Sequence, residues 1–287
     1  MSINLVFFGT DDFSIAILDE LVRAGFSPSL IITVPDKPKG RGLTLTPPPI
    51  KLWANKNSIP VLQPKSLSSS DLLYKLKTKN YQLFIVASYG KIIPKSILAI
   101  PKYGTLNVHP SLLPKFRGAS PIQSAILADE KKTGVTIMLM DEKMDHGPIL
   151  AQKKNQESRI KNQEWPTASE LEKILAEEGG KLLVKVIPDW VAGKIKAVPQ
   201  DESQATYCRK FEKADALIDL FGDPYKNYLK IQAFDHSPAY AFTERNGEKI
   251  RFSIKEAEFN DGKLILTRVI PEGKKEMPYE EFQRGLQ

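Results

Sequence analysis

The chain has 287 residues, of which 41% are hydrophobic and 26% charged, so its composition is that of a globular protein rather than a disordered or fibrous one. This length is nearly twice the ~150 residues that serve as a prior for one domain, which predicts two domains. The formal net charge is +7, and residues 1–205 hold 27 basic against 20 acidic side chains, whereas residues 206–287 hold 14 of each. A basic face confined to the first two-thirds attracts nucleic acid or a small acidic substrate, and ordinary solubilising charge is the alternative.

Several classes of protein are disfavoured by the same inspection. No uncharged apolar run approaches the ~18 residues of a spanning helix, so we expect no contact with a membrane. The first residues lack the basic region and cleavage site of a signal peptide. A lone Cys208 and three histidines make a disulfide or a structural zinc site improbable. We therefore expect a reducing, cytoplasmic location.

Strand-like and helix-like segments alternate through the first two-thirds of the chain. Short apolar runs predict strands at residues 3–8, 29–34, 83–87, 105–109 and 134–140, with residues 149–153 as a partner of the last one. Apolar residues at helical spacing predict helices at residues 13–24, 71–76, 119–128 and 170–186. This alternation predicts the α/β class, with a Rossmann-like, doubly wound and mostly parallel sheet.

The pattern changes towards the C-terminus. Residues 192–205 are polar and are interpreted as a linker, and residues 223–234 are expected to be helical. Three short runs follow, separated by Asn246-Gly247 and Asp261-Gly262, which are strong signals for hairpin turns. We expect a small OB-like β-barrel here. The predicted domains are residues 1–191, the linker 192–205, and a C-terminal domain at residues 206–287.

Familiar catalytic motifs are missing from the sequence. The first predicted strand leads into Gly9-Thr10-Asp11-Asp12 rather than G-x-G-x-x-G, and we find neither a phosphate-binding loop nor a nucleophile elbow. An α/β sheet without these motifs still binds its ligand beyond the carboxyl ends of its strands, near a change in strand order.

Asn107 and His109 stand at one such strand end, just before Pro110. Side chains two residues apart on a strand share a face, so an amide and an imidazole point the same way. Together they suit the polarisation of a carbonyl and the stabilisation of an oxyanion. An asparagine that closes a turn beside a histidine buried in the core is the alternative.

A second polar strand end follows residues 134–140, where residues 141–148 are dense in acids. One carboxylate folded back beside an imidazole would hold its protonation state and accept a proton. An exposed acidic turn is the alternative, and we interpret His146 and His236 as solvent-facing or structural.

These residues belong to a longer pattern. Residues 107–114 read Asn-Val-His-Pro-Ser-Leu-Leu-Pro and are followed by Lys115-Phe116-Arg117-Gly118 and by Pro121-Ile122-Gln123. This stretch resembles the signature of folate-dependent formyltransferases, and residues 8–13 and 86–94 also match that family.

The resemblance implies a catalytic triad of Asn107, His109 and Asp145. It also implies 10-formyltetrahydrofolate as a co-substrate, and no metal. The residues that it assigns to the folate site are Ser111, Leu112, Leu113, Pro114, Val86, Ala87, Tyr89, Gly90 and Lys91.

Residues 35–42 and 46–51 resemble an insertion of the methionyl-tRNA formyltransferases, which approaches the acceptor stem of initiator tRNA. Residues 33–56 carry five basic side chains and one acidic one, so they supply +4 of the +7 net charge. The implied tRNA contacts are Lys37, Lys39 and Arg41. Residues 204–219 and 231–234 resemble the start of the OB-like barrel of the same enzymes.

The function implied by this resemblance is transfer of the formyl group to the α-amino group of methionyl initiator tRNA, for translation initiation. The expected partners are initiator methionyl-tRNA and folate, and we expect a monomer. One alternative is a formyltransferase for a small amine, an amino sugar nucleotide or glycinamide ribonucleotide, which would need neither residues 35–51 nor the barrel. Another is a catalytically idle module that binds tRNA or folate.

The sequence departs from the family at several places. Lys143 stands where the family usually has glycine, and Leu43-Thr44 stand where many members keep basic residues. Gly147-Pro148-Ile149 is similar to glycinamide ribonucleotide formyltransferase at that one spot. The C-terminal region is net neutral, whereas a basic barrel is expected for binding tRNA.

Overall fold

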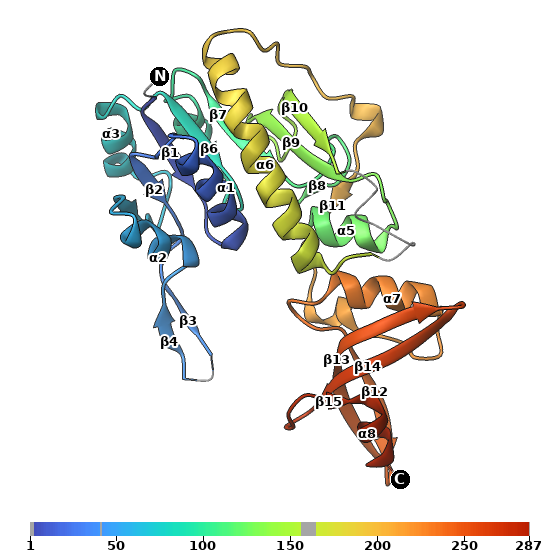
Figure 1. The fold of residues 1–287 in the computed structure, drawn as a ribbon. Coiled ribbons are helices and arrows are strands. Elements are labelled where there is room, and N and C mark those ends of the chain that lie inside the picture. Colours follow the sequence, from blue (N-terminus) through green and yellow to red (C-terminus); the bar gives the residue numbers. More distant parts are fainter. Residues whose placement is uncertain (1–2, 41, 156–164, 287) are drawn as a thin grey trace. The chain divides into compact units, whose positions relative to one another are not determined.

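The computed structural model describes residues 3–40, 42–155 and 165–286, which form two compact units (Figure 1). The first unit comprises described residues of 1–119, 134–155 and 173–207, and the second those of 120–133, 156–172 and 208–287. Residues 192–205, which we expected to form a linker, are therefore part of the first unit. None of the helices in the described residues combines the length and apolar character that a membrane span needs.

A seven-stranded sheet forms the centre of the first unit, in the order β10-β9-β7-β6-β1-β2-β5. Neighbouring strands from β5 to β7 run parallel, whereas β9 is antiparallel to both β7 and β10. This arrangement confirms the predicted doubly wound, mostly parallel sheet. The strands are β1 (Leu5–Phe8), β2 (Leu30–Ile32), β5 (Val61–Leu62), β6 (Leu83–Val86), β7 (Thr105–His109), β9 (Gly134–Leu139) and β10 (Ile149–Lys154).

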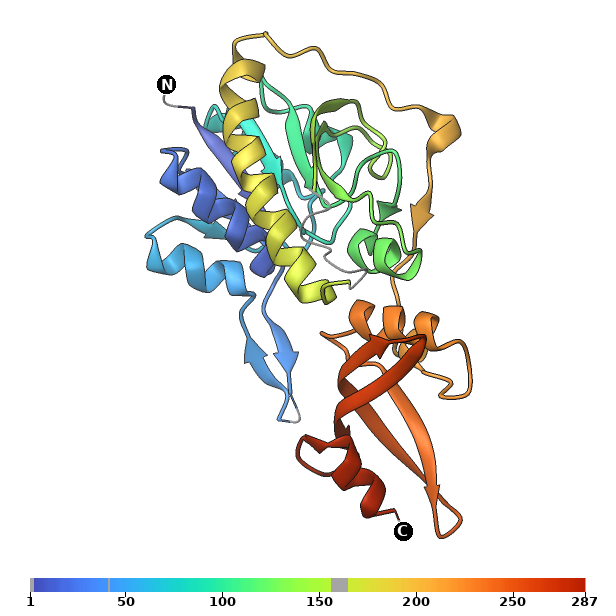
Figure 2. The same ribbon diagram turned by 45° about the vertical axis from the view of Figure 1, so that its right-hand side comes forward.

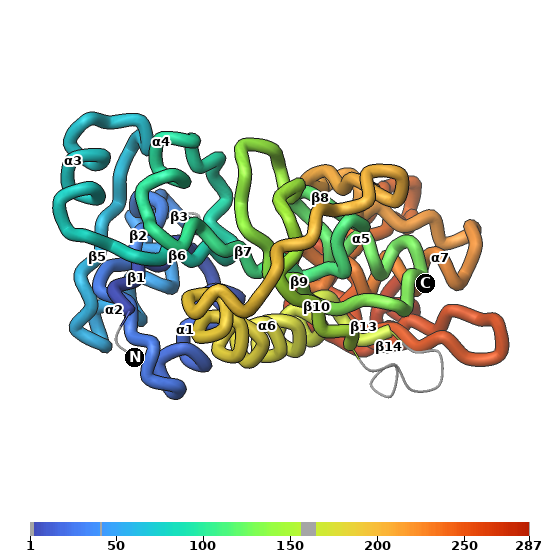
Figure 3. The backbone as a smooth tube through the Cα atoms, turned by 90° about the horizontal axis from the view of Figure 1, so that it is seen from above, coloured from blue at the N-terminus to red at the C-terminus, as the bar shows by residue number. Residues whose placement is uncertain are grey.

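Helices cover both faces of this sheet, as Figure 3 shows. On one face, α3 (Ser70–Thr78) and α4 (Lys95–Leu98) add apolar side chains to a buried cluster that includes Phe8, Phe84 and Val86. The opposite face is covered by α1 (Asp12–Arg23) and α6 (Ala168–Val191). Strands β1 and β6 are completely buried because they are covered on both sides, which explains their uninterrupted apolar sequences.

Helix α6 approaches the sheet closely at Gly179. A Cβ atom at this position would lie 2.7 Å from Cγ1 of Val108 on β7 and 3.1 Å from Cγ2 of Val135 on β9. Glycine normally weakens a helix, so its presence in the middle of α6 follows from this contact with two buried strands.

Replacing Gly179 with alanine should therefore destabilise the protein. The new methyl group forces the packing apart at a cost of about 1–3 kcal/mol, which exceeds the ~1 kcal/mol that alanine contributes to helix formation. Urea unfolding of Gly179→Ala should show a lower midpoint than wild type, and Lys181→Ala, exposed on the same helix, serves as the control. A midpoint at or above that of wild type would contradict this account of the packing.

A basic hairpin projects from the first unit after β2, as Figure 2 shows. Strands β3 (Lys37–Lys39) and β4 (Thr44–Thr46) pair antiparallel, and helix α2 (Pro49–Lys56) follows. The base of the hairpin is fixed by an ion pair of 2.8 Å between Lys51 and Asp36, which holds the pKa of the Asp36 carboxyl below its usual value.

The tip of this hairpin is exposed. Lys37 and Lys39 are accessible to solvent, and so are the apolar side chains of Leu43 and Leu45. The third expected tRNA contact, Arg41, lies outside the described residues. The insertion is thus an antiparallel hairpin in its described part, with exposed basic side chains.

The second unit contains a four-stranded antiparallel sheet in the order β12-β13-β14-β15. Residues with positive φ form both predicted turns, at Asn246-Gly247 and at Asp261-Gly262, so the hairpins are confirmed. Where we expected a small OB-like barrel, the described strands form an antiparallel meander. The elements are α5 (Pro121–Leu127), α7 (Pro224–Ala233), β12 (Tyr240–Arg245), β13 (Glu248–Asn260), β14 (Lys263–Pro271), β15 (Met277–Pro278) and α8 (Tyr279–Arg284).

Aromatic side chains hold this unit together. The ring of Phe252 on β13 lies 5.0 Å from that of Phe282 on α8. On β13 as well, the Phe259 ring lies 5.0 Å from that of Tyr225 on α7. Burial, together with the hydrogen bond to Asp129, raises the pKa of Tyr225 to about 12. Both helices are thereby attached to the same long strand.

Candidate active site

Two polar side chains are buried side by side at the carboxyl end of β7. Asn107 is 8% exposed and His109 is 4% exposed, although both lie within an otherwise apolar sheet. They share one face of the strand because side chains alternate along it, as the sequence predicts. The neighbouring residue of Asn107 on β6 is Val86, so the segment that follows β6 lies beside them.

Asp145 joins this pair from the loop between β9 and β10. Its Oδ1 atom lies 3.4 Å from Nδ2 of Asn107 and 3.7 Å from Nδ1 of His109. Its other oxygen accepts a hydrogen bond of 2.8 Å from the backbone N–H of Gly118. The structure therefore brings together the three residues that the sequence resemblance singles out, although they are up to 38 positions apart.

His109 has one defined orientation in this arrangement. Its Nε2 atom lies 2.9 Å from the carbonyl oxygen of Phe116, which can only accept, so Nε2 must carry a proton. The nitrogen that faces Asp145 is consequently Nδ1. A second proton on Nδ1 would give an imidazolium beside the Asp145 carboxylate.

Gly147 closes the loop that carries Asp145. A Cβ atom at this position would lie 1.8 Å from the carbonyl oxygen of Leu139, at the end of β9. No other residue type allows the two ends of the loop to approach so closely. Within the loop, Asp145 itself has a φ of 48°, an uncommon conformation for a residue with a side chain.

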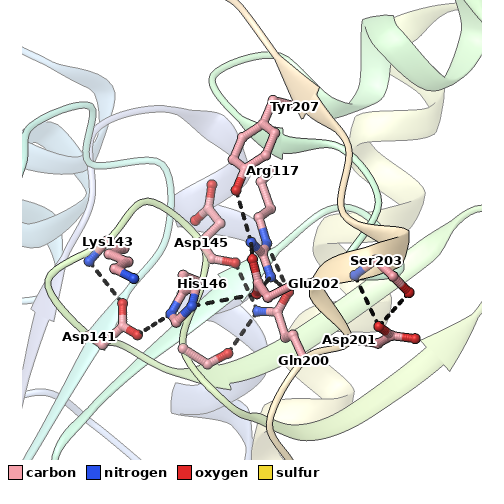
Figure 4. A network of polar contacts seen from close by, with 11 residues as sticks. Arg117, Asp141, Lys143, Asp145, His146, Gln200, Asp201, Glu202, Ser203 and Tyr207 are labelled. Carbon is pink, nitrogen blue, oxygen red and sulfur yellow. Dashed lines mark hydrogen bonds and ion pairs between the residues drawn. The ribbon is translucent and has the colours of Figure 1, made fainter.

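A glutamine from a distant part of the chain holds this loop in place (Figure 4). The Nε2 atom of Gln200 donates to the carbonyl oxygens of Asp145 and Gly147, at 2.8 and 2.7 Å. Its Oε1 atom accepts from Nε and Nη2 of Arg117, at 3.0 and 2.9 Å. Gln200 thus connects the backbone on both sides of His146 to a buried arginine.

The Arg117 side chain, on β8 (Arg117–Gly118), is completely buried. Its two Nη atoms bind the Glu202 carboxylate at 3.0 and 2.6 Å, and Nη1 also donates to the Tyr207 hydroxyl at 3.0 Å. Tyr207 belongs to β11 (Tyr207–Cys208), which pairs with β8, and Glu202 begins a short 3-10 helix over residues 202–204. The Glu202 carboxylate raises the pKa of Arg117 above its ordinary value, and in turn the guanidinium lowers the pKa of Glu202.

This ion pair makes stability depend on pH at the acidic end. Because the pKa of Glu202 is lower in the folded protein than in the unfolded chain, the pair stabilises the fold above the unfolded value of about 4.5. That contribution is lost as the pH falls below 4.5 through the depressed folded pKa. We expect the difference in Tm between wild type and Glu202→Gln to be largest near pH 6 and to shrink below pH 4. Scanning calorimetry over this range tests it, and a difference that grows on acidification would contradict it.

The residues expected to bind folate follow β6 and β7. These two strands are parallel, so the segments after them lie at the same edge of the sheet. The side chains of Val86, Ala87, Tyr89, Ser111 and Leu113 are buried, whereas those of Leu112 and Pro114 are partly accessible and Gly90 and Lys91 are exposed. Beside Lys91, the side chain of Ile92 is 81% exposed, which sequence reasoning had not singled out.

Tyr89 is the unusual member of this group. Its ring packs edge-on against Phe8, with centroids 5.5 Å apart, and its burial raises the pKa of the hydroxyl to about 12. Among the described residues, this buried hydroxyl finds no hydrogen-bond partner. A buried polar atom without a partner destabilises the fold. A bound ligand that accepts a hydrogen bond from the Tyr89 hydroxyl would remove this cost.

Comparison with known proteins shows the family of this chain. A model of the formyl transferase family matches residues 2–187, which contain Asn107, His109 and Asp145. The chain belongs to the formyl transferase family. Across 98–99% of its length it is similar to curated relatives: the methionyl-tRNA formyltransferase of Geobacillus sp. is 38% identical, over 94% of that protein.

Solved structures show the same fold at lower sequence identity. A methionyl-tRNA formyltransferase from Clostridium thermocellum superposes with a TM-score of 0.60 at 18% identity, covering 94% of this chain and 98% of that one. A sugar N-formyltransferase from Shewanella gives a TM-score of 0.63 at 19% identity, covering 95% of this chain and 99% of that one. These likenesses support the fold and do not distinguish between acceptors.

Two features of the site were not recognised in the sequence. Gln200 and Glu202 lie in the segment interpreted as a linker, and no periodicity or motif marks them. The sequence gives no sign of the role of His146, whose Nδ1 atom contacts Asp141 at 2.5 Å.

Lys143, the departure from the family pattern, is exposed and contributes its backbone N–H to Asp141. No group of three potential metal ligands occurs among the residues that the structure describes.

Proposed function

We propose that this protein transfers the formyl group of 10-formyltetrahydrofolate to the α-amino group of methionyl initiator tRNA, in the cytoplasm. The observation that carries the proposal is the convergence of Asn107, His109 and Asp145 at the carboxyl end of β7. The Asn107 amide and the His109 imidazole lie 3.4 and 3.7 Å from the same Asp145 oxygen. The three groups supply an amide donor, an imidazole that donates from Nδ1 when protonated there, and a proton acceptor.

The chemistry requires a neutral amine, a stabilised oxyanion and a proton acceptor. The amine nitrogen forms a bond to the formyl carbon, and the carbonyl oxygen becomes an oxyanion to which Asn107 Nδ2 donates. His109 Nδ1 also donates to this oxyanion when the ring carries protons on both nitrogens. Asp145 Oδ1 accepts the proton that the new ammonium group releases. That proton goes to the folate nitrogen as its bond to the formyl carbon breaks, so the amide and tetrahydrofolate leave. Nε2 of His109 stays on the Phe116 carbonyl throughout and fixes the ring.

The folate site is proposed at the segments after β6 and β7. Ile92 offers an exposed apolar surface there, and the buried Tyr89 hydroxyl needs an acceptor, so the residues present fit a flat heterocycle with polar edges. The backbone of Val86, Ala87, Ser111 and Leu113 would contribute more than their buried side chains.

The choice of tRNA as acceptor is supported by sequence similarity and by charge. The curated relatives that are 36–38% identical over nearly the whole chain are methionyl-tRNA formyltransferases. An ordered hairpin that exposes Lys37 and Lys39 has no evident use for a small amine, and phosphate groups are its natural ligands.

A second tRNA contact is proposed on residues 206–287, despite their zero net charge. On one face of β12 and β13, the Lys249 ammonium lies 4.2 Å from the Phe242 ring and the Arg251 guanidinium lies 4.1 Å from the Tyr240 ring. Basic groups over aromatic rings are typical of surfaces that bind nucleic acids. Two basic side chains therefore lie beside aromatic rings on this face, although residues 206–287 are net neutral.

Substitutions in the triad should abolish most of the activity without unfolding the protein. Loss of one preorganised oxyanion donor costs about 10²–10³ in kcat. Asn107→Ala and His109→Ala should each lose at least that much in methionyl-tRNA formylation, and the double variant should lose less than the product, because the two act as a unit. Circular dichroism verifies folding. Near-normal turnover of His109→Ala would contradict the assignment.

The basic hairpin should determine how the reaction responds to salt. If Lys37, Lys39 and Arg41 contact phosphates, their replacement by alanine should raise the KM for methionyl-tRNA. Each lost contact should flatten the plot of log kcat/KM against log salt by about one unit of slope. Binding of a folate analogue should be unchanged. An enzyme for small amines would show neither a salt slope in the wild type nor an effect of the triple variant.

A further inference from the structure

His146 lies between two carboxylates, immediately after Asp145 in the loop (Figure 4). Its Nδ1 atom is 2.5 Å from Oδ2 of Asp141, and its Nε2 atom is 3.5 Å from Oε1 of Glu202. An ionised carboxylate can accept hydrogen bonds but cannot donate them. Both ring nitrogens of His146 would have to donate, and they can do so only if the imidazole is protonated. Neutral histidine has one N–H and satisfies one of these two carboxylates.

The two contacts connect different parts of the site. Asp141 begins the loop, and its second oxygen accepts from the N–H of Lys143 at 2.9 Å, so the Asp141–His146 contact closes the loop on itself. Glu202 belongs to the segment that binds Arg117, so the His146–Glu202 contact attaches the loop to the buried guanidinium. Asp145 lies between these attachments, where the Gly118 N–H and the Gln200 amide also bind it.

We propose that protonated His146 is a positioning residue that bridges Asp141 and Glu202 and thereby keeps the Asp145 carboxylate against Asn107 and His109. The proposal rests on the proposed formyl transfer, since it assigns a role for the loop in that reaction. His146 touches no reacting atom and acts through the backbone of the loop.

Carboxylates face both ring nitrogens of His146. Asp141 and Glu202 face its two nitrogens, and Asp145 is its neighbour in the chain. The opposing cations are Arg117, which is already bound to Glu202, and Lys143. Arg117, and at longer range His146 and Lys143, lower the pKa of Glu202, so this carboxylate stays ionised where histidine changes charge. The complete bridge requires a charged imidazole, and histidine side chains carry that charge at acidic pH.

His146→Asn tests the bridge, because an asparagine amide donates to Asp141 but neither carries a charge nor reaches Glu202. At pH 6, kcat of the variant for methionyl-tRNA should be about 10-fold lower than that of wild type, since a misplaced catalytic group lowers the rate. The KM values for methionyl-tRNA and for the formyl donor should both stay within twofold of wild type. At pH 9, neutral His146 also satisfies one carboxylate, and the ratio of wild type to variant should approach one. A merely structural role would give a ratio that does not depend on pH.

Backbone amide exchange gives a readout independent of the acceptor. At pH 6, the amides of residues 141–147 should exchange about 10-fold faster in His146→Asn than in wild type, with strands β6 and β7 unchanged. Asp141→Asn should have a similar effect by removing one of the two charges. The matched control is His236→Asn in the second unit, where His236 contacts Glu172 at 3.2 Å, and it should change neither readout.

The outcomes are distinguishable. Unchanged exchange of residues 141–147 in His146→Asn overturns the bridge, and so does a constant ratio of kcat between pH 6 and 9. Absence of formyl transfer by the wild-type protein would overturn the proposed function, and the exchange measurement would still decide whether His146 holds the loop.

Discussion

The burial of the Arg117 guanidinium is the constraint on which the rest of the site depends. A guanidinium carries five N–H donors and cannot lose its charge, so a buried one is tolerated only when all five are paired. Here five hydrogen bonds reach Gln200, Glu202 and Tyr207, one for each donor. Residues 200–207 must therefore pack against β8, because any other path would leave a charge unpaired in the interior.

This constraint passes from the arginine to the reacting groups through Gln200. Its amide oxygen faces the guanidinium, so its amide nitrogen must face the other way, towards the carbonyls of Asp145 and Gly147. Thr206 adds a further attachment, since its hydroxyl accepts from the N–H of Phe116 at 2.8 Å while the Phe116 carbonyl holds His109. Gln200 and Thr206 thus orient both the Asp145 carboxylate and the His109 ring. They do so through hydrogen bonds to the backbone of Asp145, Gly147 and Phe116.

The sequence predicts the sheet well because the signals for it are local. Buried parallel strands leave uninterrupted apolar runs such as residues 83–86, and the period of two places Asn107 and His109 on one face without knowledge of the fold. Asp145 is found through the resemblance to the formyltransferase signature. Gln200 and Glu202 are not found, because their contacts with Arg117 span 83 and 85 residues and leave no periodic trace. The antiparallel pairing of the C-terminal strands is predicted by the hairpin turns, which are local signals too.

The two halves of the site are held by different kinds of interaction. Asn107 and His109 are fixed by a strand whose neighbours are apolar and buried, so their positions are as stable as the sheet itself. Asp145 lies on a loop whose described attachments are hydrogen bonds and ion pairs, and it adopts a positive φ that the loop must impose. A polar attachment depends on the charge of its members, whereas an apolar one does not. The proposed oxyanion donors are therefore built into the fold, while the proposed proton acceptor lies on a loop whose attachments depend on ionisation.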